Sequence, residues 1–147
     1  MQEKRDINVI TKEVHPIPGR RRELPYAPAI HISGPVDIFV FSGMTAAPLY
    51  HSHPHVREEH YHAPDIETQV RRAMEKVKLV LETEGLTLRH VVKITKYLTD
   101  MRDLEGMSSV LAEYFGDWKP ASTTVCVNCL NQPGARVELE VMAVRPR

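Results

Sequence analysis

Only two stretches of this sequence have the three- to four-residue apolar period of a long amphipathic helix, whereas several others alternate like strands. The first helical pattern runs from Ile66 to Leu81, and the second runs from Leu104 to Phe115. Two helices can cover one face of a sheet but hardly both faces. The sequence therefore predicts an α+β fold in which the second face of the sheet needs another partner.

Both helical patterns have defined ends. Asp65 suits the N-cap position of the first helix, because a carboxylate there accepts a hydrogen bond from a first-turn amide. Gly85 ends that pattern, as glycines commonly do after a helix. Asp103 precedes the second pattern and Gly116 closes it. We therefore expect a first helix of about five turns and a shorter second one.

Five or six strands of a mixed sheet are expected around these helices. The alternating segments are residues 36–43, 91–98, 123–130 and 135–144. The last two are joined by NQPG, whose turn chemistry predicts a hairpin. Residues 15–35 contain five prolines and two glycines, so we expect them to be extended and looping rather than helical.

The last strand separates into two faces by alternation. One face carries Val137, Leu139, Val141 and Ala143, and the other carries Glu138, Glu140 and Met142. The first face suits packing under helices, whereas the second is too mixed for a core. An interface between subunits would explain the second face, and a solvated sheet face is the alternative.

Composition limits the classes of partner. A chain of 147 residues with 42% hydrophobic residues predicts one domain over residues 1–147, with residues 1–24 as an N-terminal extension. Basic and acidic residues both number 19, so no overall field attracts nucleic acid or an anionic membrane. Residues 1–14 lack the apolar run of a signal peptide or membrane span, so a cytoplasmic protein is expected.

The two cysteines have the spacing C-x-x-C, which is also found in redox and zinc sites. Cys126 and Cys129 fall in the predicted strand 123–130, where residues three apart point to opposite faces. We therefore interpret them as two reduced thiols rather than as a disulfide or a shared metal site.

Several short strings, taken in order, resemble the RidA/YjgF family. They are PYAPAI (25–30), SG (42–43), LTDM (98–101), EYFG (113–116), PAST (120–123) and VELEVMAV (137–144). The resemblance spans Pro25 to the C-terminus. It implies a chorismate-mutase-like α+β fold and a homotrimer. It also implies clefts between the subunits that bind small carboxylates or hydrolyse enamines and imines.

The same resemblance implies roles for particular residues. Tyr26 and Ser42-Gly43 stand at substrate-binding positions of the cleft, and Glu138 stands where a glutamate holds the attacking water. Thr124 takes the place of a small cleft residue, and Ser122 stands where the deaminating branch has its substrate-binding arginine. We accordingly place Glu138, Ser122 and Thr124 in the catalytic group.

Glu138 is suited to the work of a general base. Hydrolysis of a C=N bond needs a positioned water and a group that takes its proton. A carboxyl group on a partly apolar sheet face has a raised pKa, which makes it a stronger base. The alternative is a structural glutamate in an ion pair with Arg136 or Arg145.

Ser122 cannot replace an arginine like for like, because arginine grips a carboxylate through two charged hydrogen bonds. Either another cation enters the cleft or the substrate differs. Arg20–Arg22 and Arg57 are candidate cations. We expect poor hydrolysis of 2-aminoacrylate and a preference for a larger substrate, which can bind through contacts remote from the reacting atom.

A histidine-rich loop is expected over residues 44–63. It holds five of the eight histidines, namely His51, His53, His55, His60 and His62. Three alternating imidazoles could hold zinc with an open fourth position. Pro54 interrupts any regular strand, and the family that the chain resembles uses no metal. We therefore expect no cofactor and assign His51 and His53 to the substrate cleft.

Two functions of different class remain open. The first is a hydrolase or deaminase that acts on an enamine, an imine or a related unsaturated intermediate of catabolism. The second is a non-catalytic trimer of the same fold that binds a small ligand. Ribonuclease activity has been attached to some relatives, but zero net charge places it third.

Overall fold

A computed structural model of the chain describes residues 10–59 and 61–147, so the expectations for residues 1–9 and His60 lie outside the described residues. Its main sheet has four strands in the order β3-β6-β4-β5. Their bounds are β3 (Val36–Val40), β4 (Val91–Leu98), β5 (Ala121–Cys126) and β6 (Val137–Pro146). β4 pairs in parallel with β5, and the other two pairings are antiparallel. The predicted mixed sheet is confirmed.

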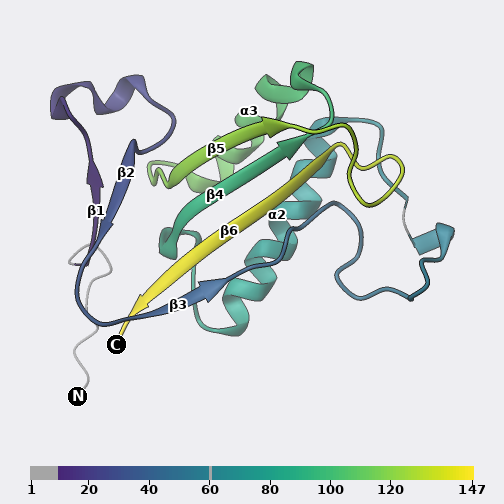
Figure 1. The fold of residues 1–147 in the computed structure, drawn as a ribbon, viewed down its shortest axis with the longest axis horizontal. Helices are drawn as coiled ribbons and strands as arrows, with labels where there is room; N and C mark the ends of the chain where they lie inside the picture. Colours follow the sequence, from purple (N-terminus) through teal and green to yellow (C-terminus); the bar gives the residue numbers. More distant parts are fainter. Residues whose placement is uncertain (1–9, 60) are drawn as a thin grey trace.

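The two predicted helices are α2 (Ile66–Thr83) and α3 (Leu104–Phe115). The Asp65 side chain caps α2 by accepting a hydrogen bond from the Thr68 amide over 2.8 Å. Gly116 follows α3 with φ 58°, a conformation that glycine adopts without steric cost. Both helices lie on the same side of the sheet, behind the strands in Figure 1. No helix in the described chain has the length and apolar character of a membrane span.

The N-terminal part of the described chain forms regular secondary structure despite its many prolines. β1 (Thr11–Val14) and β2 (Ala29–Ile32) make a separate antiparallel two-stranded sheet. A 3-10 helix over Pro18–Glu23 lies between them. The expectation of a looping segment without a helix was therefore wrong for Pro18–Glu23, where proline stands at the start of the helix. The six strands of the described chain divide into two sheets instead of one.

The predicted hairpin between the last two strands was also wrong. β4 lies between β5 and β6, so the segment with NQPG crosses from one edge of β4 to the other. β5 ends at Cys126, and Cys129 therefore lies outside the strand that was predicted for both cysteines. Both cysteines are free and exposed.

The core lies between the sheet and the two helices. Val137, Leu139, Val141 and Ala143 are all buried there, as alternation predicted. On the opposite face of the sheet, Val40 and Ile38 are 81% and 60% exposed. Within the described chain, β3 therefore leaves apolar side chains exposed on that face.

Candidate functional site

Three residues of interest share a pocket between α3 and the β5 edge of the sheet. Tyr26, Ser122 and Lys96 line it together with side chains of α3, and its volume is about 220 Å³. Ala27 makes a parallel bridge with Ala121, and the Ala27 amide donates to the Pro120 carbonyl over 3.3 Å. This pairing holds Tyr26 beside the start of β5.

Lys96 is the residue of this pocket that sequence reasoning missed. It is the register partner of Thr124 in the β4–β5 pair and lies on the same face of the sheet as Ser122. Burial lowers the pKa of Lys96, and nearby Lys93 lowers it further. Alternation in β4 puts Lys96 on the same face as Ile94 and Leu98, which packs under the helices. A lysine among buried apolar residues was the sequence signal that could have indicated its role.

The second group of predicted residues surrounds Glu138. A Cβ atom at Gly43 would lie 2.0 Å from the Glu138 Oε1 atom, so any other residue there would displace the carboxylate from this position. Burial raises the pKa of Glu138, Glu140 raises it further, and Lys76 acts in the opposite direction. The structure thus brings Gly43 and Glu138 together, and exposed Ser42 precedes Gly43 in the chain.

The proposed ion-pair partners of Glu138 are engaged elsewhere. Arg136 binds Asp103 with an N–O distance of 2.5 Å, and Arg145 lies 3.5 Å from Asp37. Within residues 10–59 and 61–147, no side chain forms a hydrogen bond or an ion pair with the Glu138 carboxylate. The alternative of a structural glutamate paired with Arg136 or Arg145 is therefore wrong.

The candidate replacement cations do not line the Tyr26 pocket. Arg20 binds Glu23, and Arg21 bridges Glu13 and Asp117. Arg57 lines a different cavity. The Lys119 ammonium lines the Tyr26 pocket but donates to the carbonyl oxygens of Arg21 and Leu24. Lys96 is therefore the cation of this pocket that is available to a ligand.

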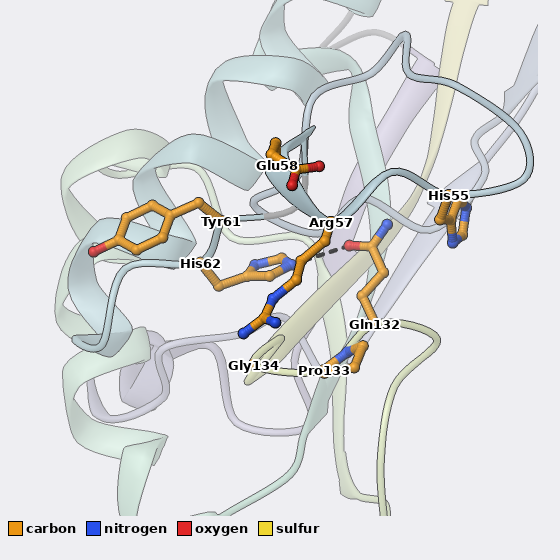
Figure 2. A pocket seen from close by; sticks show the side chains of 8 residues that line it. All are labelled: His55, Arg57, Glu58, Tyr61, His62, Gln132, Pro133 and Gly134. Atoms are coloured by element: carbon orange, nitrogen blue, oxygen red, sulfur yellow. Dashed lines mark hydrogen bonds between the residues drawn. The ribbon is translucent and has the colours of Figure 1, made fainter.

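A larger cavity of about 670 Å³ lies beside the histidine-rich loop (Figure 2). Its lining includes His55, Arg57, Glu58, Tyr61 and His62. The ring of His62 is held by Gln132, with 3.0 Å between Nε2 and Oε1. His51 and His53 line neither this cavity nor the Tyr26 pocket.

The predicted catalytic residues fall into two groups within one subunit. Alternation and strand register put Ser122 and Thr124 on the face of the sheet that carries Leu139 and the helices. Glu138 is the neighbour of Leu139 and projects from the opposite face. A single copy of the chain therefore does not assemble Ser122 and Glu138 into one site.

The mixed four-stranded sheet, its two helices on one face and its uncovered second face define the fold of the YjgF and L-PSP proteins. Residues 21–145 match the family described as endoribonuclease L-PSP. The chain belongs to this family, which is also the RidA/YjgF family that its sequence resembles.

Individual relatives support the same assignment. A RutC family protein of Pyrococcus horikoshii is 42% identical over 81 residues, which are 55% of this chain and 64% of that protein. The match thus spans slightly less than two thirds of this curated relative. The Rid family protein YyfA of Yersinia pestis, of unknown function, is 32% identical with a TM-score of 0.62. That comparison covers 81% of this chain and 86% of YyfA.

A third relative covers more of the chain. A member of the YjgF/YER057c/UK114 family from Mycobacterium tuberculosis is 28% identical with a TM-score of 0.59. The comparison covers 90% of this chain and 98% of that one. The likeness therefore extends over nearly the whole fold.

Proposed function

We propose that the protein is a small-molecule hydrolase that deaminates an enamine, an imine or a related unsaturated intermediate. The observation that carries this proposal is the Glu138 carboxylate, which is half-buried beside Gly43 and has a raised pKa. A partly desolvated carboxylate without a cation bound to it is suited to take a proton from water. The free thiols of Cys126 and Cys129 agree with a reducing cytoplasmic setting.

The proposed reaction has two steps. Glu138 takes a proton from water while the water oxygen attacks the imine carbon, and the C=N electrons move to the nitrogen. Glu138 returns this proton to the nitrogen, which gives a carbinolamine. The C–N bond of the carbinolamine then breaks as its hydroxyl proton passes to the nitrogen, so ammonia leaves and a carbonyl compound remains. An enamine first tautomerises to the imine. Glu138 is the only residue of this site for which the proposal requires a proton transfer.

The Tyr26 pocket supports a substrate that carries a carboxylate but differs from the smallest imino acids. Lys96 supplies a positive charge on the sheet face that carries Ser122. An ammonium is a point charge and lacks the planar fork with which arginine binds a carboxylate. Lys96 therefore attracts an anion but orients it less, and contacts elsewhere on a larger substrate would have to complete the orientation.

This difference leads to a prediction about Ser122→Arg. The wild-type protein should release little ammonia from enzymatically generated 2-aminoacrylate. Ser122→Arg should raise the rate at least about tenfold, because a charge-assisted hydrogen bond contributes roughly 1.5–3 kcal/mol. Ammonia release is the measurement.

Ser109→Arg is the matched control, because Ser109 is exposed on α3 and does not line the Tyr26 pocket. It should leave the rate at the wild-type level. Fast wild-type turnover, or equal gains from the two arginines, would contradict the proposed role of position 122.

A trimer with clefts between its subunits would bring Ser122 and Thr124 of one subunit close to Glu138 of another. Ser122 and Glu138 lie on opposite faces of the sheet in one subunit, so a cleft that contains both must draw one of them from a second copy. The open sheet face carries exposed Ile38 and Val40, which favours its burial against other copies.

We therefore predict a particle of three times the chain mass by sedimentation or light scattering at micromolar concentration. Val40→Asp should dissociate it, because the new carboxylate would be buried in the interface without a partner. Leu79→Asp, on the exposed side of α2, should leave the trimer intact. A wild-type monomer would contradict the shared cleft.

A non-catalytic ligand-binding trimer is the second candidate, and Ser122 is the observation that favours it. Loss of the substrate-binding arginine fits a cleft that has kept binding and lost chemistry. A panel of enamines separates the two functions, because only the enzyme releases ammonia and only its activity depends on Glu138.

A further inference from the structure

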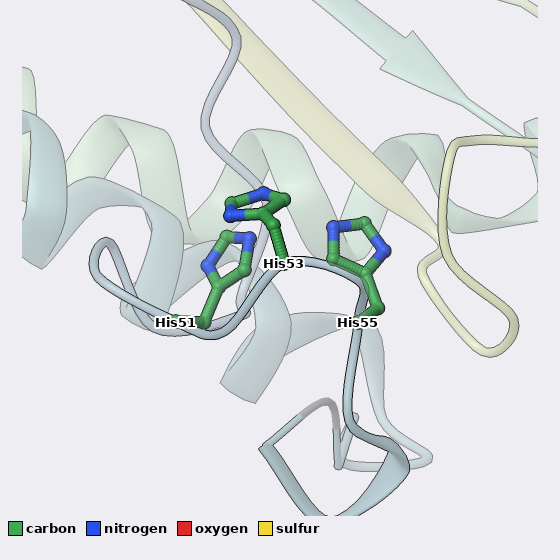
Figure 3. Close-up of side chains that lie close together, drawn as sticks. All are labelled: His51, His53 and His55. Atoms are coloured by element: carbon green, nitrogen blue, oxygen red, sulfur yellow. The ribbon is translucent and has the colours of Figure 1, made fainter.

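We propose that His51, His53 and His55 form a zinc site in the histidine-rich loop. One ligand nitrogen from each ring lies within 4.8 Å of the other two. The ring centroids are 4.6 Å apart for His51 and His53, 5.1 Å for His51 and His55, and 5.0 Å for His53 and His55. Figure 3 shows the three rings gathered on one side of the loop.

The spacing is close to what zinc requires. Zn–N bonds of about 2.0–2.1 Å in a tetrahedral site place the ligand nitrogens about 3.3 Å apart. The rings therefore need to approach one another by about 1.5 Å at most, a distance within reach of exposed side-chain rotations. His53 and His55 are both exposed residues of the loop.

The first ligand is already oriented. His51 Nδ1 lies 2.8 Å from the Pro48 carbonyl oxygen, and it can only donate to that oxygen. The proton on Nδ1 leaves Nε2 as the ring nitrogen with the lone pair. Metal-binding histidines are commonly fixed in this way, with one ring nitrogen bonded to a carbonyl and the other bonded to the metal.

The loop itself is held at both sides of the three histidines. Ala46 and Ala47 are buried, and Leu49 packs against the core. The Ser52 amide and hydroxyl donate to the two carboxylate oxygens of Glu59 over 2.6 Å and 2.9 Å. These contacts shorten the segment that must be ordered when a metal binds, which lowers the entropic cost of binding.

The number of histidine ligands makes this an open zinc site rather than a closed structural one. Three neutral imidazoles leave the fourth zinc position for water or another ligand. His55 also lines the 670 Å³ cavity, whose lining includes Arg57. A doubly charged ion at the rim of that cavity would favour an anionic fourth ligand. This inference departs from the expectation of a metal-free loop, which was based on Pro54 and on the family resemblance.

The test uses the full-length chain without a histidine tag, after chelation and dialysis. Titration with Zn²⁺ alone, by calorimetry and by competition with a chromogenic chelator, should show one ion per chain. Co²⁺ in place of zinc should give the intense visible absorption of a tetrahedral site. His53→Ala and His55→Ala should each weaken zinc binding beyond the roughly 10- to 100-fold loss that follows removal of an outer-shell partner.

His31→Ala is the matched control, because His31 is an exposed histidine of β2 outside the cluster. It should bind zinc like the wild type, and circular dichroism should show that all three variants are folded. Absence of binding, or binding that the cluster variants do not weaken, would overturn the proposal. Zinc is measured directly here, so the result is independent of whether the protein releases ammonia.

Discussion

Replacing Glu138 by glutamine should lower the rate of ammonia release from an accepted enamine or imine by about 10²- to 10⁴-fold, the usual contribution of a general base. Glutamine keeps the size and shape of the side chain beside Gly43, where a Cβ atom would be only 2.0 Å from the carboxylate oxygen. It cannot take a proton from water. The measurement is ammonia release under substrate saturation, together with the pH dependence of kcat.

The pH profile distinguishes a base from a merely structural glutamate. A general base must be ionised, so activity should fall as the pH is lowered through the pKa of Glu138. Burial raises that pKa, so the fall should occur at higher pH than for an ordinary glutamate. Glu138→Gln should remove this limb together with most of the rate.

Glu140→Gln is the matched control, because Glu140 is exposed two residues away on the same face of β6. It should keep most of the activity. The acidic limb should move to lower pH, because Glu140 contributes to the raised pKa of Glu138. Equal loss of rate in both variants, or no loss in Glu138→Gln, would contradict the assignment of the base.

Gln69→Met should lower the free energy of unfolding by about 3–5 kcal/mol, because it leaves buried backbone groups without partners. Gln69 is fully buried in α2. Its amide nitrogen donates to the Ala63 and Gly134 carbonyl oxygens over 2.7 Å and 3.0 Å. Its oxygen accepts from the Arg136 amide over 2.8 Å. Methionine fills similar space, so lost hydrogen bonds account for most of the change.

Urea denaturation at fixed protein concentration measures this effect, since assembly makes stability depend on concentration. Arg72→Met, on the exposed side of the same helix, should change the free energy of unfolding by less than about 0.5 kcal/mol. A similarly small change in Gln69→Met would show that the three hydrogen bonds do not hold the segments around α2 together.

Local chemistry determined the parts of the fold that the sequence predicted well. The α3 bounds, Leu104–Phe115, agree with the periodic pattern, and Asp65 caps α2 as its position predicted. Helix periods and caps depend on residues within a few positions of one another. The same is true of the alternation in β6, which separated Leu139 from Glu138.

The resemblance determined more of the candidate site than residue patterns did. Gly43 and Glu138 are 95 positions apart, and only the ordered family strings brought them into one hypothesis. No pattern of neighbouring residues relates two positions that are so far apart in the sequence. The local alternation marked Lys96 as a lysine on the buried face, but only the strand register places it beside Thr124.

By itself, the sequence thus determined the helices, their ends, the buried face of the last strand and the family. The tertiary structure decided the strand order, which places β4 where a hairpin was predicted. It also decided that Ser122 and Glu138 lie on opposite faces and that three histidine rings converge. The physical reason is that caps and periods come from short-range interactions. Strand pairing and the approach of side chains depend instead on how the whole chain buries its apolar surface.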